Sequence, residues 1–298
     1  MRIDTAQHAL ALPDLEWLLE RYPEQPLPSY LMGRVQAALG NTQAAAEAFS
    51  TAARGIEALT PEGKQANPEH MLLRGLVEIE RNNTESARRS LELFLKRDPY
   101  NPQGRRALGQ LLLNSDKAYE AIGVLEPLVD LYPKEVNGLL LLAAAYFETA
   151  NYKQAIRHYR RALERAPGRM PIELELARSL YSAGDIGGAS ALLETIYARP
   201  DSPVGVGSLL VKVKLAEGAY ERAQSVADQL LARDESAAEY HALRAQALIA
   251  RGQRKLAIES FRRAVTLDPS FVLPYLRLGE IYLGGVSGLS RMTRFSQH

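Results

Sequence analysis

The chain has 298 residues, with 36 lysines and arginines, 35 aspartates and glutamates, and no cysteine. This charge balance argues against a protein that mainly binds polyanions, so nucleic acid is not an expected partner. The lack of cysteine excludes thiol catalysis, cysteine-ligated zinc and disulfide bonds. No stretch is apolar for long enough to span a membrane, and we expect no signal peptide.

The first elements of the chain predict half a repeat followed by a complete one. Residues 1–25 contain PDLEWLLERYP, which has the pattern of a second helix and ends in the Tyr-Pro pair that recurs at 132–133. A helix pair is expected over 26–59, with Ala45 in a central position. Eight further residues, TPEGKQAN at 60–67, break the register and are predicted to be an insertion.

A period of 34 residues organises the chain from residue 68 to residue 271. One column of this repeat is alanine at every step, and self-similarity of this length predicts stacked helical units. The six predicted units are 68–101, 102–135, 136–169, 170–203, 204–237 and 238–271. The alanine column consists of Ala87, Ala121, Ala155, Ala189, Ala223 and Ala257.

Each unit is predicted to contain two amphipathic helices. In 136–169, apolar residues recur at intervals of three and four, which predicts helices over 137–149 and 152–165. Small residues occupy one site of the first helices, where two helix axes must approach closely. They are Gly33, Gly75, Gly109, Ala143, Ala177, Ala245 and Gly279. Glycines between the paired helices are expected to end the first of them, and these are Gly40, Gly184, Gly218 and Gly252.

The C-terminal end also stops short of a full repeat. Residues 272–284 are predicted to be the first helix of a further unit, and 285–298 an irregular tail with Arg291 where alanine is expected. Because a solenoid needs capped ends to stay soluble, we interpret the chain as a slice of a longer array. The alternative is a complete protein whose tail folds over its last helix. The unpaired terminal helices suggest self-association.

The pattern small-x-x-aromatic, alanine, aromatic, alanine, proline over residues 26–271 resembles the tetratricopeptide repeat family. The resemblance implies an all-α, right-handed superhelical α-solenoid of antiparallel helix pairs. One unit, 204–237, departs from the family pattern, because Lys214 and Ala227 replace its two aromatic residues. We expect this unit to pack more loosely. Pro127 lies inside a predicted second helix and is expected to kink it.

Catalysis has little support in this sequence. No two of the five histidines have metal-ligand spacing, and no catalytic or phosphate-binding motif is present. We therefore expect a non-catalytic protein with no metal and no cofactor. The basic stretch NYKQAIRHYRRALERAP (151–167) is interpreted as the outer face of one second helix, because Glu126 and Glu194 occupy the positions equivalent to Arg160.

The family resemblance implies that the first helices line a concave groove, which would bind an extended peptide or a partner helix. The inward sites of the first helices are largely apolar with cations at intervals, and an apolar groove exposed to water is usually a binding site. Its cations are expected to select acidic groups of the partner. The alternative is that curvature buries these residues against neighbouring repeats. The predicted groove residues are Tyr30, Arg34, Leu72, Leu76, Arg106, Gln110, Leu140, Phe147, Arg178, Tyr181, Lys212 and Gln246.

Residues 87–133 also resemble the repeat proteins of the exosortase, or PEP-CTERM, system, through NPQGRRALGQLLL and EAIGVLEPL. That narrower resemblance implies a scaffold in the periplasm or cell envelope, associated with exopolysaccharide and protein sorting. Two alternatives stay open. One is a cytosolic adaptor, and the other is the repeat region of a larger enzyme or polysaccharide-export channel. The sequence itself does not fix the compartment.

Overall fold

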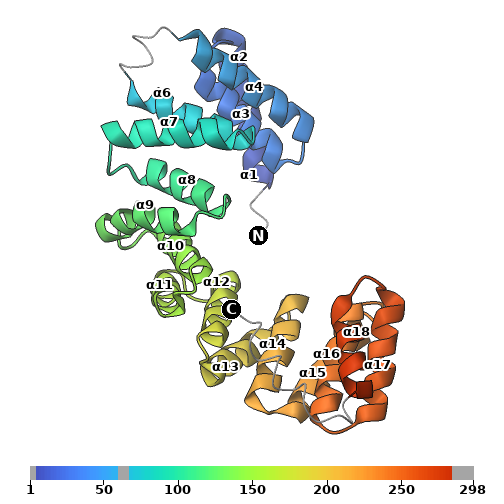
Figure 1. Ribbon diagram of the computed structural model, residues 1–298. Helices are drawn as coiled ribbons and strands as arrows, with labels where there is room; N and C mark the ends of the chain where they lie inside the picture. The colour runs from blue at the N-terminus through green and yellow to red at the C-terminus, as the bar shows by residue number, and fades with distance from the viewer. Residues whose placement is uncertain (1–4, 60–66, 284–298) are drawn as a thin grey trace. The chain divides into compact units, whose positions relative to one another are not determined.

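The computed structural model describes residues 5–59 and 67–283, and within these ranges all regular secondary structure is helical (Figure 1). The chain divides into two compact units, Met1–Asn151 and Tyr152–His298. The predicted insertion lies outside the described residues except for Asn67, and so does the predicted tail 285–298.

The first unit contains helices that alternate in direction along the chain. Consecutive helices pack against each other, with α3 on α4, α6 on α7 and α8 on α9 (Figure 1). Residues 1–25, where one second helix was expected, contain two helices. The helices are α1 (Thr5–Leu10), α2 (Leu12–Arg21), α3 (Pro26–Ala38), α4 (Thr42–Ala58), α6 (Pro68–Glu80), α7 (Thr84–Arg97), α8 (Pro102–Leu113), α9 (Ala118–Leu131) and α10 (Val136–Glu148).

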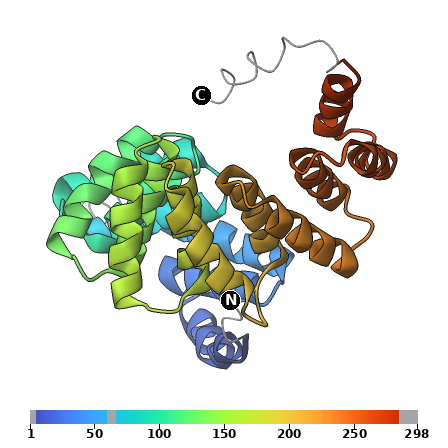
Figure 2. The same ribbon diagram turned by 90° about the horizontal axis from the view of Figure 1, so that it is seen from below.

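The second unit continues the same alternation. Helix α12 packs on α13, α14 on α15, and α16 on α17, which in turn contacts α18 (Figure 2). The predicted solenoid of antiparallel helix pairs is therefore confirmed. The helices are α11 (Tyr152–Arg165), α12 (Met170–Ser182), α13 (Ile186–Tyr197), α14 (Val204–Glu217), α15 (Tyr220–Arg233), α16 (Ala238–Ala250), α17 (Arg254–Leu267) and α18 (Val272–Leu283).

The turn inside each helix pair contains a residue with a left-handed backbone. The expected glycines have φ between 75° and 85° at Gly40, Gly184, Gly218 and Gly252. Other pairs use a different residue at the equivalent place, namely Asn82, Asp116 and Ala150, with φ of 58°, 57° and 56°. Alanine is the costliest of these choices, because its Cβ crowds the following carbonyl and it has no polar side chain to compensate.

Replacing Ala150 by glycine is expected to raise the free energy of unfolding by about 0.5–1 kcal/mol, because glycine adopts this backbone without strain. Gly184→Ala, at the equivalent turn, is the matched control and should lower it by a similar amount. Urea denaturation followed by circular dichroism measures both changes. Equal stability of Ala150→Gly and wild type would contradict the prediction.

The alanine column forms the tightest line of the core. All six alanines from Ala87 to Ala257 have no exposed surface. The glycines of the first helices face large side chains of the second helices. A Cβ at Gly75 would lie 2.6 Å from Leu91, and a Cβ at Gly109 would lie 2.5 Å from Leu125. In these helix pairs, a small residue of the first helix therefore packs against a large residue sixteen places later.

The unit 204–237 reverses this match. Val211 occupies the position of the small residue, and Ala227 the position of the large one. Both residues are fully buried, and so are Val206, Leu210 and Leu230 of the same unit. The unit 204–237 thus keeps a buried core with the larger residue on α14 and the smaller one on α15, and its looser packing stays a prediction.

Pro127 lies inside α9, which continues without interruption to Leu131. One turn before the proline, Arg105 of α8 donates a hydrogen bond from Nη1 to the backbone oxygen of Val124 at 2.8 Å. Its Nε donates to the backbone oxygen of Pro99 at 2.6 Å. Burial lowers the pKa of the Arg105 guanidinium from its usual value. This side chain fastens α9 to α8 beside the proline.

Candidate partner-binding surface

Within each of the two compact units, the first helices of successive repeats form a layer of their own. In the first unit α8 contacts both α6 and α10, and in the second unit α14 contacts both α12 and α16. Within each unit, no pair of successive second helices among the described residues has contacts as extensive as these. Each unit is therefore more compact on the side of its first helices, which places these helices on the inner side of its curve.

A pocket of about 730 Å³ lies on the first-helix layer of the first unit, and we call it the α3–α8 pocket. Its apolar wall comes from α3 and α6, which contribute Tyr30, Leu31, Leu72 and Leu76. Such a volume is typical of ligand-binding pockets, which measure about 300–1,000 Å³. The pocket can therefore accept several side chains of a partner.

The α3–α8 pocket lies beside the break in the repeat register. The eight additional residues 60–67 separate the repeats that contain α3 and α6. These two helices still meet, because Arg34 of α3 lies 3.5 Å from Glu80 of α6 and Tyr30 shares a buried core with Val77. The pocket opens next to these contacts, between α3, α6 and α8.

A second pocket of about 580 Å³, the α14–α18 pocket, lies on the first-helix layer of the second unit. Ala238 and Ala242 of α16 line it together with Lys212 of α14 and Phe271 before α18. Two alanines on one helix face leave space where other first helices have larger residues. The floor of this pocket is consequently shallow and apolar.

The structure brings only some of the predicted groove residues together. Tyr30, Leu72 and Leu76 line the α3–α8 pocket, and Lys212 and Gln246 line the α14–α18 pocket. Tyr30 and Leu72 are buried, so they form the floor rather than protruding anchors. The remaining predicted residues line neither pocket, and these are Arg34, Arg106, Gln110, Leu140, Phe147, Arg178 and Tyr181.

The sequence prediction missed several pocket residues. Leu27 and Leu31 of α3 are 52% and 41% exposed, and both line the α3–α8 pocket. Two carboxylates, Glu69 and Asp98, lie at its rim. The insertion at 60–67 was the available signal, because a break in the period marks the place where the regular spacing of the repeats is interrupted.

The four predicted groove cations each have a carboxylate partner within the protein. Arg34 lies 3.5 Å from Glu80 and also donates to the Tyr30 hydroxyl at 3.1 Å. These contacts raise the pKa of Arg34, and the hydrogen bond to Tyr30 is the main cause. The other pairs are Arg106–Glu135 at 3.1 Å, Arg178–Glu175 at 4.0 Å and Lys212–Glu239 at 3.4 Å. Each of these cations therefore already has a carboxylate neighbour in the protein, which competes with any acidic group of a partner.

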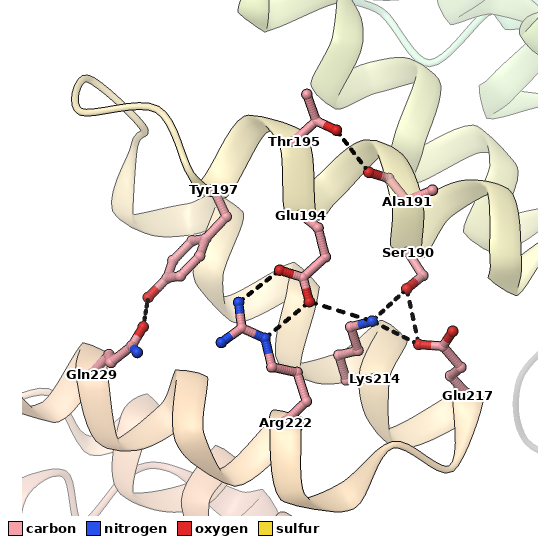
Figure 3. Close-up of polar contacts among 9 residues, drawn as sticks. All are labelled: Ser190, Ala191, Glu194, Thr195, Tyr197, Lys214, Glu217, Arg222 and Gln229. Atoms are coloured by element: carbon pink, nitrogen blue, oxygen red, sulfur yellow. Dashed lines mark hydrogen bonds and ion pairs between the residues drawn. The ribbon is translucent and has the colours of Figure 1, made fainter.

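A polar cluster joins α13, α14 and α15 (Figure 3). The Lys214 side chain is only 12% exposed, and its ammonium group donates to Ser190 at 2.7 Å and to Glu217 at 2.9 Å. Glu194 lies 3.4 Å from the same ammonium group and accepts two hydrogen bonds from Arg222 at 2.9 and 2.7 Å. Lys214 therefore occupies the position of an aromatic residue in the family pattern, and the partners of its ammonium group compensate for its partial burial.

These contacts change the titration of both carboxylates. Hydrogen bonds from Arg222 are the main cause that lowers the pKa of Glu194. For Glu217, the hydrogen bond from Lys214 is the main cause of a lowered pKa, followed by the one from Ser190. A depressed folded-state pKa stabilises the fold above the ordinary carboxyl range, and this stabilisation disappears as the pH falls.

Within residues 5–59 and 67–283, no cluster of histidine and carboxylate side chains has the arrangement of a metal site. The same part of the chain contains no helix that is long and apolar enough to cross a membrane.

Comparison with family models identifies the repeats. Two models described as tetratricopeptide repeat match residues 2–63 and 208–270, and residues 146–205. Together they cover more than half of the chain. A model of anaphase-promoting complex, cyclosome, subunit 3 matches residues 80–162. No curated protein sequence matches the chain at a significant level.

Solved structures share this architecture at low sequence identity. A tetratricopeptide repeat protein from Parabacteroides merdae is 16% identical, with a TM-score of 0.58 over 90% of this chain and 98% of that chain. YrrB, described as a TPR protein with an unusual peptide-binding site, is 14% identical, with a TM-score of 0.53 over 63% of this chain and 97% of its own. The Cut9-Hcn1 structure matches at 14% identity and a TM-score of 0.58, over 93% of this chain and 53% of that chain.

Proposed function

Because this chain belongs to the tetratricopeptide repeat family, a family of scaffolds for protein–protein interaction, we propose that it binds a partner segment on its first-helix layer. The observation that carries the proposal is the position of the two pockets. Both open on the first helices, and both have apolar floors with polar rims. This composition is typical of surfaces that fix a partner by apolar contact and orient it by polar contact.

The proposal assigns no catalytic role to the chain. YrrB, which has the same fold, is described as having a peptide-binding site, and this supports a peptide or helix as the bound element. The half-buried Phe147 and Tyr181 lie outside both pockets. They would then contact only a partner that extends beyond a single pocket.

Photo-crosslinking from single positions tests the side of the molecule that binds. A photoreactive amino acid replaces Gln110 or Arg178, which are exposed on first helices of the two units. Matched control positions are Arg89 and Glu259, which are exposed on second helices. We expect a discrete crosslinked partner in cells from at least one first-helix position and none from the controls. Crosslinks from the control positions alone would contradict the proposal.

We further propose that the partner belongs to an envelope or exopolysaccharide-associated sorting system. The resemblance of residues 87–133 to exosortase-system repeat proteins supports this finer assignment. The test is the genome that encodes the chain, together with the identity of the crosslinked partner. Exosortase and exopolysaccharide genes nearby, with a partner among their products, are the expected result. A cytosolic partner would instead favour the adaptor alternative.

A further inference from the structure

We propose that the α3–α8 pocket binds an amphipathic helix whose apolar stripe is flanked by lysine or arginine. This inference rests on the proposed scaffold function and specifies the chemistry of the partner. It reverses the preference expected from the sequence, which assigned the selection of acidic groups to arginines and a lysine of the first helices. Three features of the pocket support it.

The first feature is a pair of exposed leucines. Leu27 and Leu31 lie one helical turn apart on α3, so they point in similar directions. Across the pocket, Leu72 and Leu76 have the same spacing on α6. Two such rows form a trough, and a helix with apolar residues at intervals of three and four fits a trough of this kind.

The second feature is the sign of the charge. Among the residues that the structure describes, the pocket lining contains the carboxylates Glu69 and Asp98 and the imidazole of His70, but no lysine or arginine. Neither carboxylate forms an ion pair with a residue that the structure describes, although Asp98 accepts a hydrogen bond from the Asn101 amide at 3.0 Å. The nearest predicted cation, Arg34, is already paired with Glu80. A basic flank on the partner would complement the two carboxylates, whereas an acidic flank would be repelled.

The third feature concerns the backbone of the partner. Two rim amides already cap helices of this chain. Asn67 accepts the backbone N–H of Glu69 at 2.9 Å, and Asn101 accepts the backbone N–H groups of Gln103 and Gly104, both at 3.0 Å. An extended peptide needs external partners for its backbone groups, but a helix satisfies most of them internally. Both asparagines are therefore committed within the chain, whereas the Gln25 and Gln103 amides also line the pocket, so the helical form rests mainly on the spacing of the leucines.

Synthetic helices of about 18 residues, long enough to be helical in isolation, provide the probe. One peptide places leucines along a single stripe with lysine on both flanks, and its isomer has glutamate on the flanks. Calorimetry measures the binding of each peptide to the full chain. We expect the lysine peptide to bind about tenfold more tightly than the glutamate peptide.

Variants of the chain locate that preference. Leu31→Asp is expected to weaken the lysine peptide about tenfold or more, whereas Leu93→Asp, at an exposed leucine of α7, should not. The double variant Glu69→Gln with Asp98→Asn removes both pocket charges and should abolish the preference for lysine. Its control, Asp130→Asn with Glu164→Gln, removes two exposed charges elsewhere and should preserve it. Circular dichroism confirms that each variant is folded.

Other outcomes would overturn the inference. Equal binding of the two peptides, or tighter binding of the glutamate peptide, would refute the charge preference. Unchanged binding to Leu31→Asp would refute the pocket, and equal binding of a proline-interrupted lysine peptide would refute the helical form. If neither peptide binds while first-helix positions still crosslink a partner, the inference fails and the scaffold proposal stands.

Discussion

Replacing Leu125 by alanine is expected to lower the free energy of unfolding by about 2–5 kcal/mol, because it opens a cavity in the core between α8 and α9. Gly109→Val is expected to lower it by about 1–3 kcal/mol, because the new side chain collides with Leu125. The double variant should be more stable than the sum of the two losses predicts. It recreates the pairing that the protein itself has at Val211 and Ala227.

A double-mutant cycle measures this coupling. Urea denaturation gives the four stabilities, and amide hydrogen exchange in α8 and α9 shows whether the change is local. We expect a favourable coupling of about 1–2 kcal/mol between the two substitutions. A matched control combines Gly109→Val with Leu91→Ala, which removes a leucine of equal burial from the neighbouring helix pair. Additive losses in the first cycle would show that volume exchange does not explain the unit 204–237.

Replacing Lys214 by methionine is expected to lower the free energy of unfolding by about 1–3 kcal/mol at neutral pH. The apolar part of the side chain is retained, but Glu217 and Ser190 lose their ammonium partner. Glu194 and Glu217 have side chains that are 32% and 36% exposed, so water screens part of the loss. The control is Lys212→Met, because Lys212 is 49% exposed and its pair with Glu239 contributes less than about 1 kcal/mol.

The same variant should change the acid sensitivity of the protein. The folded-state pKa values of Glu194 and Glu217 lie below their ordinary values. The contribution of these two carboxylates to the free energy of unfolding is therefore fully present above the ordinary carboxyl range. It is lost as the pH falls through their lowered pKa values. Lys214→Met removes the main cause of the shift at Glu217. We expect a flatter decline of stability with acid, and an unchanged pH profile would contradict the role of the cluster.

The repeat architecture could be predicted because its determinants are periodic. The alanine column fixed the register over six units, and all of those alanines are fully buried. The glycines between paired helices identified four turns with a left-handed backbone. Such positions depend on short-range geometry and close packing, which leave a direct signal in the sequence.

The candidate binding surface could be predicted only in part, because its pockets depend on features that do not repeat. The family resemblance gave the first-helix side, and the structure places five of the twelve expected residues at pockets on that side. Leu27 and Leu31 are exposed on α3 beside the break in the register, and a period cannot show which side chains stay exposed there. The ion pairs of Arg106 and Lys212 depend on single side chains, Glu135 at the end of the same repeat and Glu239 at the start of the next one.

The close helix contacts join neighbours or next neighbours along the chain, as with α6, α7 and α8. Folding then requires little long-range loop closure, so local helix pairs can form early and neighbours can add to them. Opening can likewise begin in one helix pair and spread from there. A partner seated between α3 and α6 would bridge the place where the repeat register is interrupted. The two sides already share a buried core that includes Tyr30, Phe49 and Val77, and binding there would strengthen their coupling during unfolding.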